Sequence, residues 1–260
     1  MLNLAFILCF NFAIGIIVSL LFVRRQDLES RFFRTNGIIA TIFMLVAFFI
    51  GREKYFVSYE LLIMVVLLIA YSVNVFWLPV FVERLMLWVV AIGGGFILWH
   101  TLPLLDSTAI WRKADFGTLL VGGILMGMCL VAMNVGHSYL SSVKLSMRPL
   151  RTTTLAIGSM LIFRLVLISI FIPVLVKTVP QAATEVSKLF ELQNVTLLAI
   201  ALVRVLFGVL GPLVLFYMTW ETVKIKSNQS ATGILYALLA LVLVGEASAF
   251  YLTLTTSLPI

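Results

Sequence analysis

The stretch NLAFILCFNFAIGIIVSLLFV, residues 3–23, contains 21 residues and no charged side chain. Crossing the hydrocarbon core of a membrane, roughly 30 Å thick, takes about 20 apolar residues in a helix, because lipid offers the backbone no hydrogen-bond partners. This stretch begins directly after Met1 and Leu2, has no basic leader and ends at Arg24 and Arg25. We therefore expect an uncleaved membrane anchor and not a signal peptide.

Apolar runs of similar length recur to the end of the chain. They cover about 3–23, 36–51, 57–79, 85–102, 117–140, 153–176, 195–220 and 231–254. Of the 260 residues, 62% are hydrophobic and 11% are charged, and the mean hydropathy of +1.16 lies above the range of soluble domains. The runs lack the alternating pattern of a membrane β-barrel. The sequence predicts an all-α integral membrane protein, with residues 1–260 forming one transmembrane domain of about eight helices.

Basic residues in the short connections predict the orientation of the chain. Assigning alternate connections to opposite sides puts ten Lys and Arg residues on one side and six on the other. The larger set is Arg24, Arg25, Arg31, Arg34, Arg84, Lys144, Arg148, Arg151, Lys224 and Lys226; the smaller is Arg52, Lys54, Arg112, Lys113, Lys177 and Lys188. Because cytoplasmic loops carry the excess of Lys and Arg, we expect both termini on the outer side of a cell inner (plasma) membrane. The net charge of +7 then indicates contacts with anionic phospholipid and not with nucleic acid.

Three charged residues fall deep inside the last three predicted spans. At about 1.5 Å per residue, Arg164 lies roughly 16 Å from the inner edge and Arg204 roughly 14 Å from the outer edge. Glu246 lies roughly 22 Å from the inner edge, within about 8 Å of the depth of both arginines. Each charge costs about 2.5–3.5 kcal/mol at the membrane centre, so such residues face the protein interior and pair. We expect a cluster with one excess positive charge, serving as a proton path, a ligand site or a structural lock between helices.

The seventh predicted span carries a candidate break beside Arg204. Gly208 and Gly211 follow Arg204 on the same helical face, and Pro212 comes next. Small residues let a neighbouring helix or ligand approach the backbone, and proline removes the donor for a carbonyl near Gly208. The sequence therefore predicts a locally broken helix at the level of the buried charges.

A second group of polar residues lies near the inner end of the fifth predicted span. Gly123, Gly127, Asn134 and His137 recur at helical spacings, so we expect His137 to point into the bundle. Histidine, tyrosine and arginine at a membrane edge can bind a quinone headgroup or relay protons to it. The alternative is a histidine bonded to a neighbouring helix beside arginines that bind lipid. The candidate ligand-binding residues are His137, Tyr139, Asn134, Arg148 and Arg151.

The remaining candidate ligands argue against two kinds of cofactor site. His100 and His137, the only two histidines, belong near opposite faces of the membrane, roughly 30 Å apart, which disfavours a haem held by both. The sequence has no His/Cys cluster and no grouped carboxylates, so it predicts no metal site. In the connection from Thr178 to Asn194, apolar residues at helical spacing after Pro180 predict a helix on the membrane surface.

Three functional hypotheses are consistent with these patterns. The first is an integral membrane subunit of a larger respiratory or redox complex, which contacts a quinone near His137 and conducts protons through Arg164, Arg204 and Glu246. The chain has no autonomous catalytic motif, so any oxidoreductase activity would belong to a multi-chain enzyme whose other membrane-protein subunits hold the remaining cofactors. The second is a proton-coupled secondary transporter of a small anionic solute, although no internal repeat is apparent. The third is a non-catalytic membrane scaffold or assembly subunit.

Overall fold

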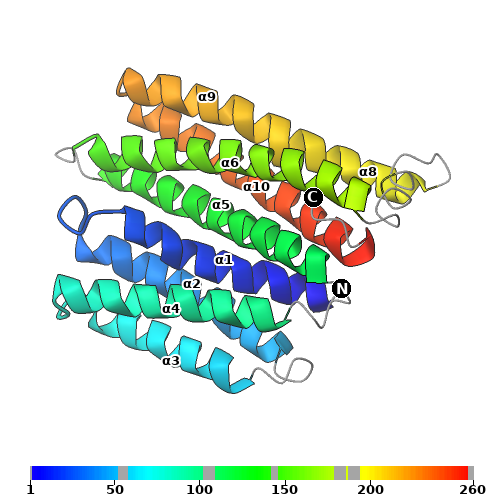
Figure 1. The fold of residues 1–260 in the computed structure, drawn as a ribbon. Helices are drawn as coiled ribbons and strands as arrows, with labels where there is room; N and C mark the ends of the chain where they lie inside the picture. The colour runs from blue at the N-terminus through cyan, green and yellow to red at the C-terminus, as the bar shows by residue number, and fades with distance from the viewer. Residues whose placement is uncertain are drawn as a thin grey trace.

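The computed structural model describes residues 2–51, 58–101, 109–141, 146–178, 186 and 194–256, and these residues form helices and turns without a strand. The helices are α1 (Leu2–Phe22), α2 (Ser30–Gly51), α3 (Ser58–Asn74), α4 (Val80–Thr101), α5 (Ala109–Ser141), α6 (Arg148–Thr178), α8 (Val195–Val205), the π-helical turn η2 (Leu206–Leu210), α9 (Gly211–Lys224) and α10 (Asn228–Thr256). Because α8, η2 and α9 follow one another directly, they form one continuous helical rod (Figure 1).

Seven segments of the described chain are long and apolar enough to cross a membrane. They are Leu4–Phe22, Ser30–Gly51, Val80–Thr101, Asp115–Tyr139, Arg148–Val174, Val195–Lys224 and Asn228–Thr256. The apolar part of α3, Tyr59–Asn74, is shorter. The described chain is therefore all-helical, with the lengths and composition of a multi-pass membrane protein and with α3 as a further candidate span.

Several helices extend beyond the apolar runs from which they were predicted. The second helix starts at Ser30 and not near residue 36, and α5 starts at Ala109 and not near residue 117. Hydropathy marks only the lipid-facing length of a helix, whereas the hydrogen-bonded rod continues into polar residues. Conversely, α3 ends at Asn74, and α4 starts at Val80, directly after Pro79. The predicted surface helix after Pro180 lies outside the described residues except for Val186.

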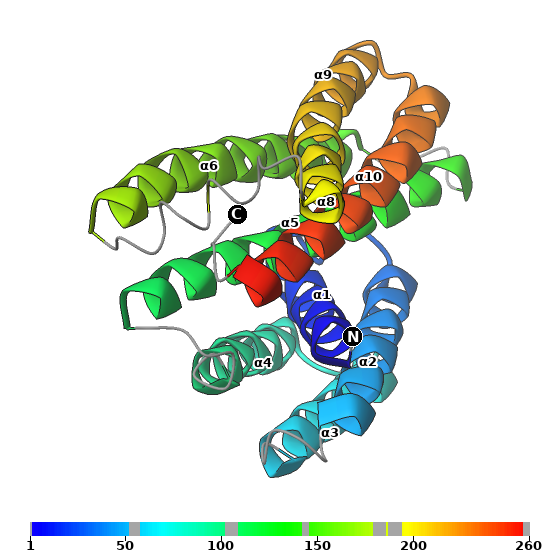
Figure 2. The same ribbon diagram turned by 90° about the vertical axis from the view of Figure 1, so that its right-hand side faces the viewer.

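The helices form two groups of four with the same packing order. In the first group, α1 packs on α2 and α4, and α3 packs on the same two helices. In the second group, α5 packs on α6 and α10, and the α8–α9 rod packs on those two helices. Seen end-on, the order runs in the same rotational sense in both groups, and the parallel helices α1 and α5 meet at the centre (Figure 2). The two groups are thus related by an approximate two-fold axis along the helices.

Glycines bring α1 and α5 into backbone contact at this centre. A Cβ atom on Gly127 would overlap the backbone of Gly15, and one on Gly123 would lie 2.7 Å from the carbonyl oxygen of Asn11. Small residues that allow such approach replace the hydrophobic driving force that helix pairs lack in lipid. The interface between the two groups is therefore closely packed.

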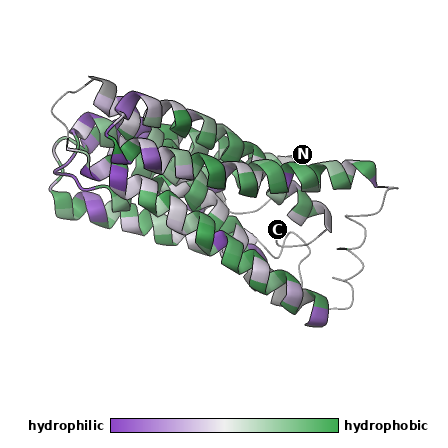
Figure 3. Ribbon diagram, turned by 90° about the horizontal axis from the view of Figure 1, so that it is seen from above, coloured by the Kyte–Doolittle hydropathy of each residue, from purple (hydrophilic) through white to green (hydrophobic). Residues whose placement is uncertain are grey.

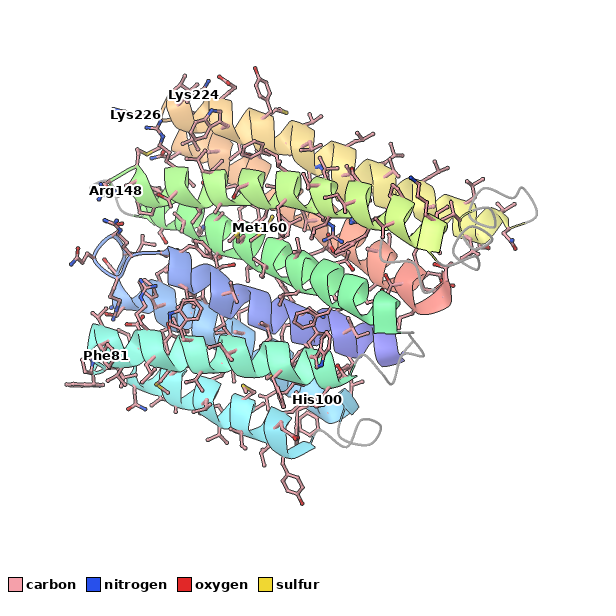
Figure 4. All side chains as sticks on the ribbon, viewed as in Figure 1. Phe81, His100, Arg148, Met160, Lys224 and Lys226 are labelled. Atoms are coloured by element: carbon pink, nitrogen blue, oxygen red, sulfur yellow. The ribbon has the colours of Figure 1, made fainter. Side chains whose placement is uncertain are left out.

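The two ends of the bundle differ in polarity. The connections α1–α2, α3–α4 and α9–α10 lie at one end with the start of α6, whereas α1 begins and α10 ends at the other (Figure 1). Hydrophilic residues gather mostly at the first end (Figure 3). That end, which we call the basic end, carries Arg148, Lys224 and Lys226, and His100 lies at the opposite end (Figure 4).

Candidate functional site

The three charged residues predicted near mid-membrane are in contact. Arg164 Nη1 on α6 lies 2.6 Å from Glu246 Oε2 on α10, and Arg204 Nη1 on α8 lies 3.3 Å from Glu246 Oε1. Their side chains are only 2%, 0% and 1% exposed, in the order Arg164, Glu246, Arg204. Arg204 also donates to the carbonyl oxygen of Gly245 at 3.4 Å. These residues, hereafter the charge triad, join three helices through one carboxylate.

Glycines make room for the charge triad. A Cβ atom on Gly122 of α5 would overlap Glu246 Oε2 and would lie 2.8 Å from Arg164 Nη1. A Cβ atom on Gly245 would overlap the backbone of Gly208, so α10 and η2 touch through their main chains. The sequence thus places its smallest residues where two guanidinium groups and a carboxylate must fit between four helices.

The helical rod that carries Arg204 is irregular next to the charge triad. The Gly211 N–H donates to the Leu206 carbonyl oxygen, five residues earlier, which defines the π-helical turn η2. Pro212 has no N–H to offer Gly208, four residues before it, so a regular α-helical ladder is interrupted at this point. The helix break predicted between Gly208 and Pro212 is therefore a π-helical turn. Single π-helical turns occur frequently at functional sites.

The arginines have more donors than the described residues use. Nε and Nη2 of both Arg164 and Arg204 have no hydrogen-bond acceptor in the described part of the chain. The 2.6 Å contact between Arg164 and Glu246 is an ion pair that lacks hydrogen-bond geometry. Two guanidinium groups and one carboxylate leave one formal positive charge, and Arg164 and Arg204 repel each other. The site therefore suits an anionic or strongly accepting group.

A small cavity of about 10 Å³ lies beside Arg164, a volume that holds about one water-sized particle. One wall comes from Leu161, Arg164 and Leu165 on α6. The other comes from Gly208 and Val209 on η2, with Leu213 just beyond. The cavity therefore joins a charged arginine to the irregular part of the neighbouring helix.

Packing around the charge triad is looser away from the basic end. None of the described α6 side chains beyond Arg164 is buried, and Arg204 is the only buried residue of α8. Beyond the charge triad α6 diverges from α8 (Figure 2), and its described side chains there are exposed or half-buried. This part of α6 therefore has fewer buried residues than the part at the basic end, although Phe171 still lies against Gly117 of α5.

The expectation that His137 points into the bundle is wrong, because its side chain is exposed. Asn11 and Gly15 of α1 lie against Gly123 and Gly127 of α5. In that parallel register α1, which ends at Phe22, reaches only the level of Asn134. His137 therefore lies about one helical turn beyond the level at which α1 ends.

The other residues of the predicted quinone site have separate partners. Asn134 donates to Asn36 Oδ1 of α2 at 2.8 Å, and the Tyr139 hydroxyl donates to the carbonyl oxygen of Ser146. The Arg151 guanidinium lies 5.4 Å from the Trp220 ring centroid of α9, and Arg148 is exposed. The structure therefore does not gather these four residues around His137.

The two histidines lie at opposite ends of their helices. His100 is exposed near the end of α4, with its ring centroid 4.3 Å from that of Phe96. It lies at the end opposite Arg148 (Figure 4), whereas His137 is in the last turns of α5. One haem cannot bridge two residues placed in this way.

A buried carboxylate that sequence reasoning missed lies at the basic end. Glu83 of α4 is 1% exposed and lies 2.9 Å from Arg25 Nε. Next to it, Arg84 donates to the carbonyl oxygens of Leu21 at 2.6 Å and Val23 at 2.5 Å, which caps the end of α1. Both Glu83 and Arg84 precede the apolar run at 85–102, so hydropathy assigned them to a loop. The signal that places them in a helix is Pro79, which is typical of a residue just before a helix.

No group of three or more metal-ligating side chains occurs in the described part of the chain. Cys9 and Cys129 are free thiols. No protein-family model, curated protein or solved structure matches this chain.

Proposed function

We propose that this chain is a secondary transporter that binds a small monovalent anion at the charge triad and moves it together with a proton. The observation that carries the proposal is the excess positive charge of Arg164, Glu246 and Arg204, combined with guanidinium donors that lack acceptors. A monovalent anion makes the site neutral and supplies the missing acceptor. A buried cluster that served only to lock helices together would need neither an excess charge nor guanidinium donors without acceptors.

The cavity beside Arg164 supports a small ligand. Its volume of about 10 Å³ holds about one water-sized particle and not a quinone ring, so a chloride ion, which is larger than water, would need the walls to move slightly apart. Arg164 forms part of the cavity wall, and its free Nε and Nη2 can donate to an anion placed there. The class of ligand is therefore a compact anion, of which chloride is the simplest, and the larger nitrate and formate would need the cavity to widen further.

Glu246 is the residue proposed to carry the proton. In the described structure it is the counter-ion of both arginines. One bound monovalent anion makes the site neutral, and protonation of Glu246 then returns it to the single positive charge of the empty site. Proton and anion binding therefore favour each other, and by thermodynamic linkage the effect is reciprocal.

The helix architecture fits a transport cycle. Transporters commonly bind their substrates near the membrane midplane, beside interrupted helices, in folds built from repeated halves. Here η2 interrupts a helix next to Arg204, and two groups of four helices share one packing order around α1 and α5. The loosely packed part of α6 is the segment proposed to move.

The proposal includes an orientation in the cell membrane. We place the basic end in the cytoplasm, with eight spans including α3 and both termini outside, in a cell inner (plasma) membrane that has anionic phospholipid at its cytoplasmic face. Positively charged connections remain preferentially on the cytoplasmic side. The inner side of the protein is therefore the basic end, and the outer side is the end that carries His100.

A membrane subunit of a larger redox complex is the second candidate. His137 favours it, because an exposed histidine at the basic end is accessible to a quinone or to another membrane subunit. In that case the charge triad conducts protons or binds an acidic group of a partner chain. Purification of the native protein with cofactor-bearing subunits or a bound quinone would favour this candidate.

Uptake of labelled chloride by the purified chain in liposomes tests the first proposal. We expect an inward proton gradient to drive chloride uptake in the wild-type chain and in Arg148→Gln, an exposed arginine on the same helix as Arg164. Arg164→Gln should abolish uptake. If chloride, nitrate and formate all fail to accumulate under a proton gradient in the wild-type chain, the proposed transport is wrong.

A further inference from the structure

Asp115 is a buried carboxylate on α5 that lies outside the charge triad. Its side chain is 3% exposed, and Oδ1 has no hydrogen-bond partner among the described residues. Neighbouring helices cover this end of α5. The Phe116 ring lies 5.5 Å from the Trp99 ring of α4, and Phe171 of α6 lies against Gly117. Burying a carboxylate without a hydrogen-bond partner costs free energy, so its presence in this position calls for a functional explanation.

The register between α5 and α10 places Asp115 relative to Glu246. Gly122 faces Glu246, and fourteen residues towards the basic end on each helix, Gly136 faces Thr232. The two helices are thus antiparallel in a constant register. Seven residues in the other direction, the same register puts Asp115 and Thr253 at one level. That level is about 10 Å from Glu246 along the helix axis.

In the described structure, the seam between α5 and α10 contains buried hydroxyl groups on the outer side of Glu246 and none on the inner side as far as Thr232. Outward from Glu246, the buried polar residues are Asp115, Thr118, Ser248, Thr253 and Thr256, which lie among the apolar Leu119, Val121, Ala249, Phe250 and Leu252. Inward, before Thr232 is reached, every buried residue of the two helices is apolar, glycine or Cys129. Hydroxyl groups can pass a proton along a chain that includes water, whereas apolar side chains cannot. The polarity therefore points to one side of the membrane.

We infer that Asp115 exchanges protons between the outer aqueous phase and Glu246. This inference rests on the proposed function, since it names the entry point for the coupled proton. The protonated Asp115 carboxyl releases its proton to a hydroxyl or water of the seam, and Glu246 gains a proton at the other end of the chain. Asp115 then takes up a proton from outer water, so that one proton enters for each proton delivered. Asp115 binds and releases only a proton in this proposal, and the anion binds at the charge triad.

Other charged groups lie near but do not pair with Asp115 in the described structure. On the helices packed against this part of α5, they are His100 of α4, Lys177 of α6 and the Glu246 and Arg164 pair one level inward. His100 and Lys177 are both exposed. Asp115 is therefore the only described carboxylate between the outer end of α5 and the charge triad.

The test compares proton and chloride movements in liposomes that contain Asp115→Asn. We expect the proton influx that accompanies chloride to fall by about a hundredfold, as for loss of a positioned proton-transfer group. Asp115→Glu should restore it, and Asp27→Asn, a carboxylate at the basic end, should leave it unchanged. Chloride affinity, measured by titration calorimetry, should change by less than about twofold, because Asp115 is remote from the arginines.

A wild-type ratio of protons to chloride in Asp115→Asn would overturn the inference while the proposed function stands. Coupling to a sodium gradient in place of the proton gradient would overturn both. Infrared spectra supply a readout that does not depend on transport. A carboxyl band that titrates with pH in the wild type should vanish in Asp115→Asn. If the wild-type chain moves no anion but this band titrates, the transport proposal fails and the proton-exchange role of Asp115 survives.

Discussion

Arg164 and Glu246 form an ion pair at 2.6 Å between α6 and α10, and the other oxygen of the same carboxylate lies 3.3 Å from Arg204. One buried anion thus holds two buried cations. Buried ion pairs add little net stability, because the cost of removing the charges from water offsets their attraction. Removing one partner is costly, since it leaves an uncompensated charge. Stability alone therefore does not explain the charge triad, and this agrees with the ligand binding proposed above.

Glu246→Gln should destabilise the protein strongly, since it leaves Arg164 and Arg204 facing each other without a counter-ion. We expect a loss of about 3–5 kcal/mol in unfolding free energy, measured by denaturant unfolding in detergent without added chloride. The double variant Arg164→Gln with Glu246→Gln should recover much of this loss, because it restores the net charge of one. Glu221→Gln, which breaks an exposed pair with Lys224, is the control and should cost less than about 1 kcal/mol. If Glu246→Gln and Glu221→Gln lowered the unfolding free energy by the same amount, Glu246 would not be needed to compensate the charges of Arg164 and Arg204.

Gly122→Ala should disturb the charge triad while leaving the fold intact. The added methyl group would overlap Glu246 Oε2, so the carboxylate must move away from Arg164. We expect proton-coupled chloride uptake to fall by about tenfold or more, as for small displacements at a reacting centre. Gly117→Ala on the same helix is a matched control, because its nearest neighbour would be Phe171 at 3.8 Å. Wild-type uptake in Gly122→Ala would mean that the position of Glu246 does not matter.

Gly127→Ala should weaken the contact between the two four-helix groups. Its methyl group would overlap the main chain of Gly15, which cannot rotate aside as a side chain can. Overpacking of this kind costs about 1–3 kcal/mol or more, so the midpoint of thermal unfolding should fall. Gly95→Ala on α4 should leave the midpoint unchanged, since nothing lies within 4 Å of the added atom. If Gly127→Ala and Gly95→Ala have the same midpoint of thermal unfolding, α1 and α5 do not make the backbone contact described.

Reporter fusions test the proposed orientation. Alkaline phosphatase folds to its active form only outside the cytoplasm, so a fusion at the C-terminus should be active. A fusion after Lys226, in the connection between α9 and α10, should be inactive. The opposite pattern would invert the assignment of the basic end and would place Asp115 on the cytoplasmic side.

Much of the architecture could be predicted from hydropathy, because lipid imposes a length and a composition on each helix. The depth of Arg164, Arg204 and Glu246 followed from the same count of residues. A cluster of the three was expected from the cost of a lone charge in lipid, but which atoms meet could not be predicted, since that depends on the rotation of three helices about their axes and on the space that Gly122 leaves. The similar packing order of the two helix groups also depends on contacts that no residue pattern displayed.

His137 and Glu83 show why the rest of the sequence interpretation needed the structure. A helical stripe identifies a face of α5, but it does not say where the opposing helix stops, and α1 stops before His137. For Glu83, hydropathy assigned a charge at the edge of an apolar run to water. The helix actually starts at Val80, and Glu83 packs against Arg25 in the first turn.

Anion binding by the purified protein tests the central claim most directly. Titration calorimetry with chloride, repeated with nitrate and formate, should give one saturable site per chain. Arg164→Gln and Arg204→Gln should each weaken that site by about tenfold to a hundredfold, the range for a lost hydrogen bond to a charged group. Arg148→Gln should bind as the wild type does. If no anion gives saturable binding, or if Arg164→Gln binds with wild-type affinity, the charge triad is not an anion site.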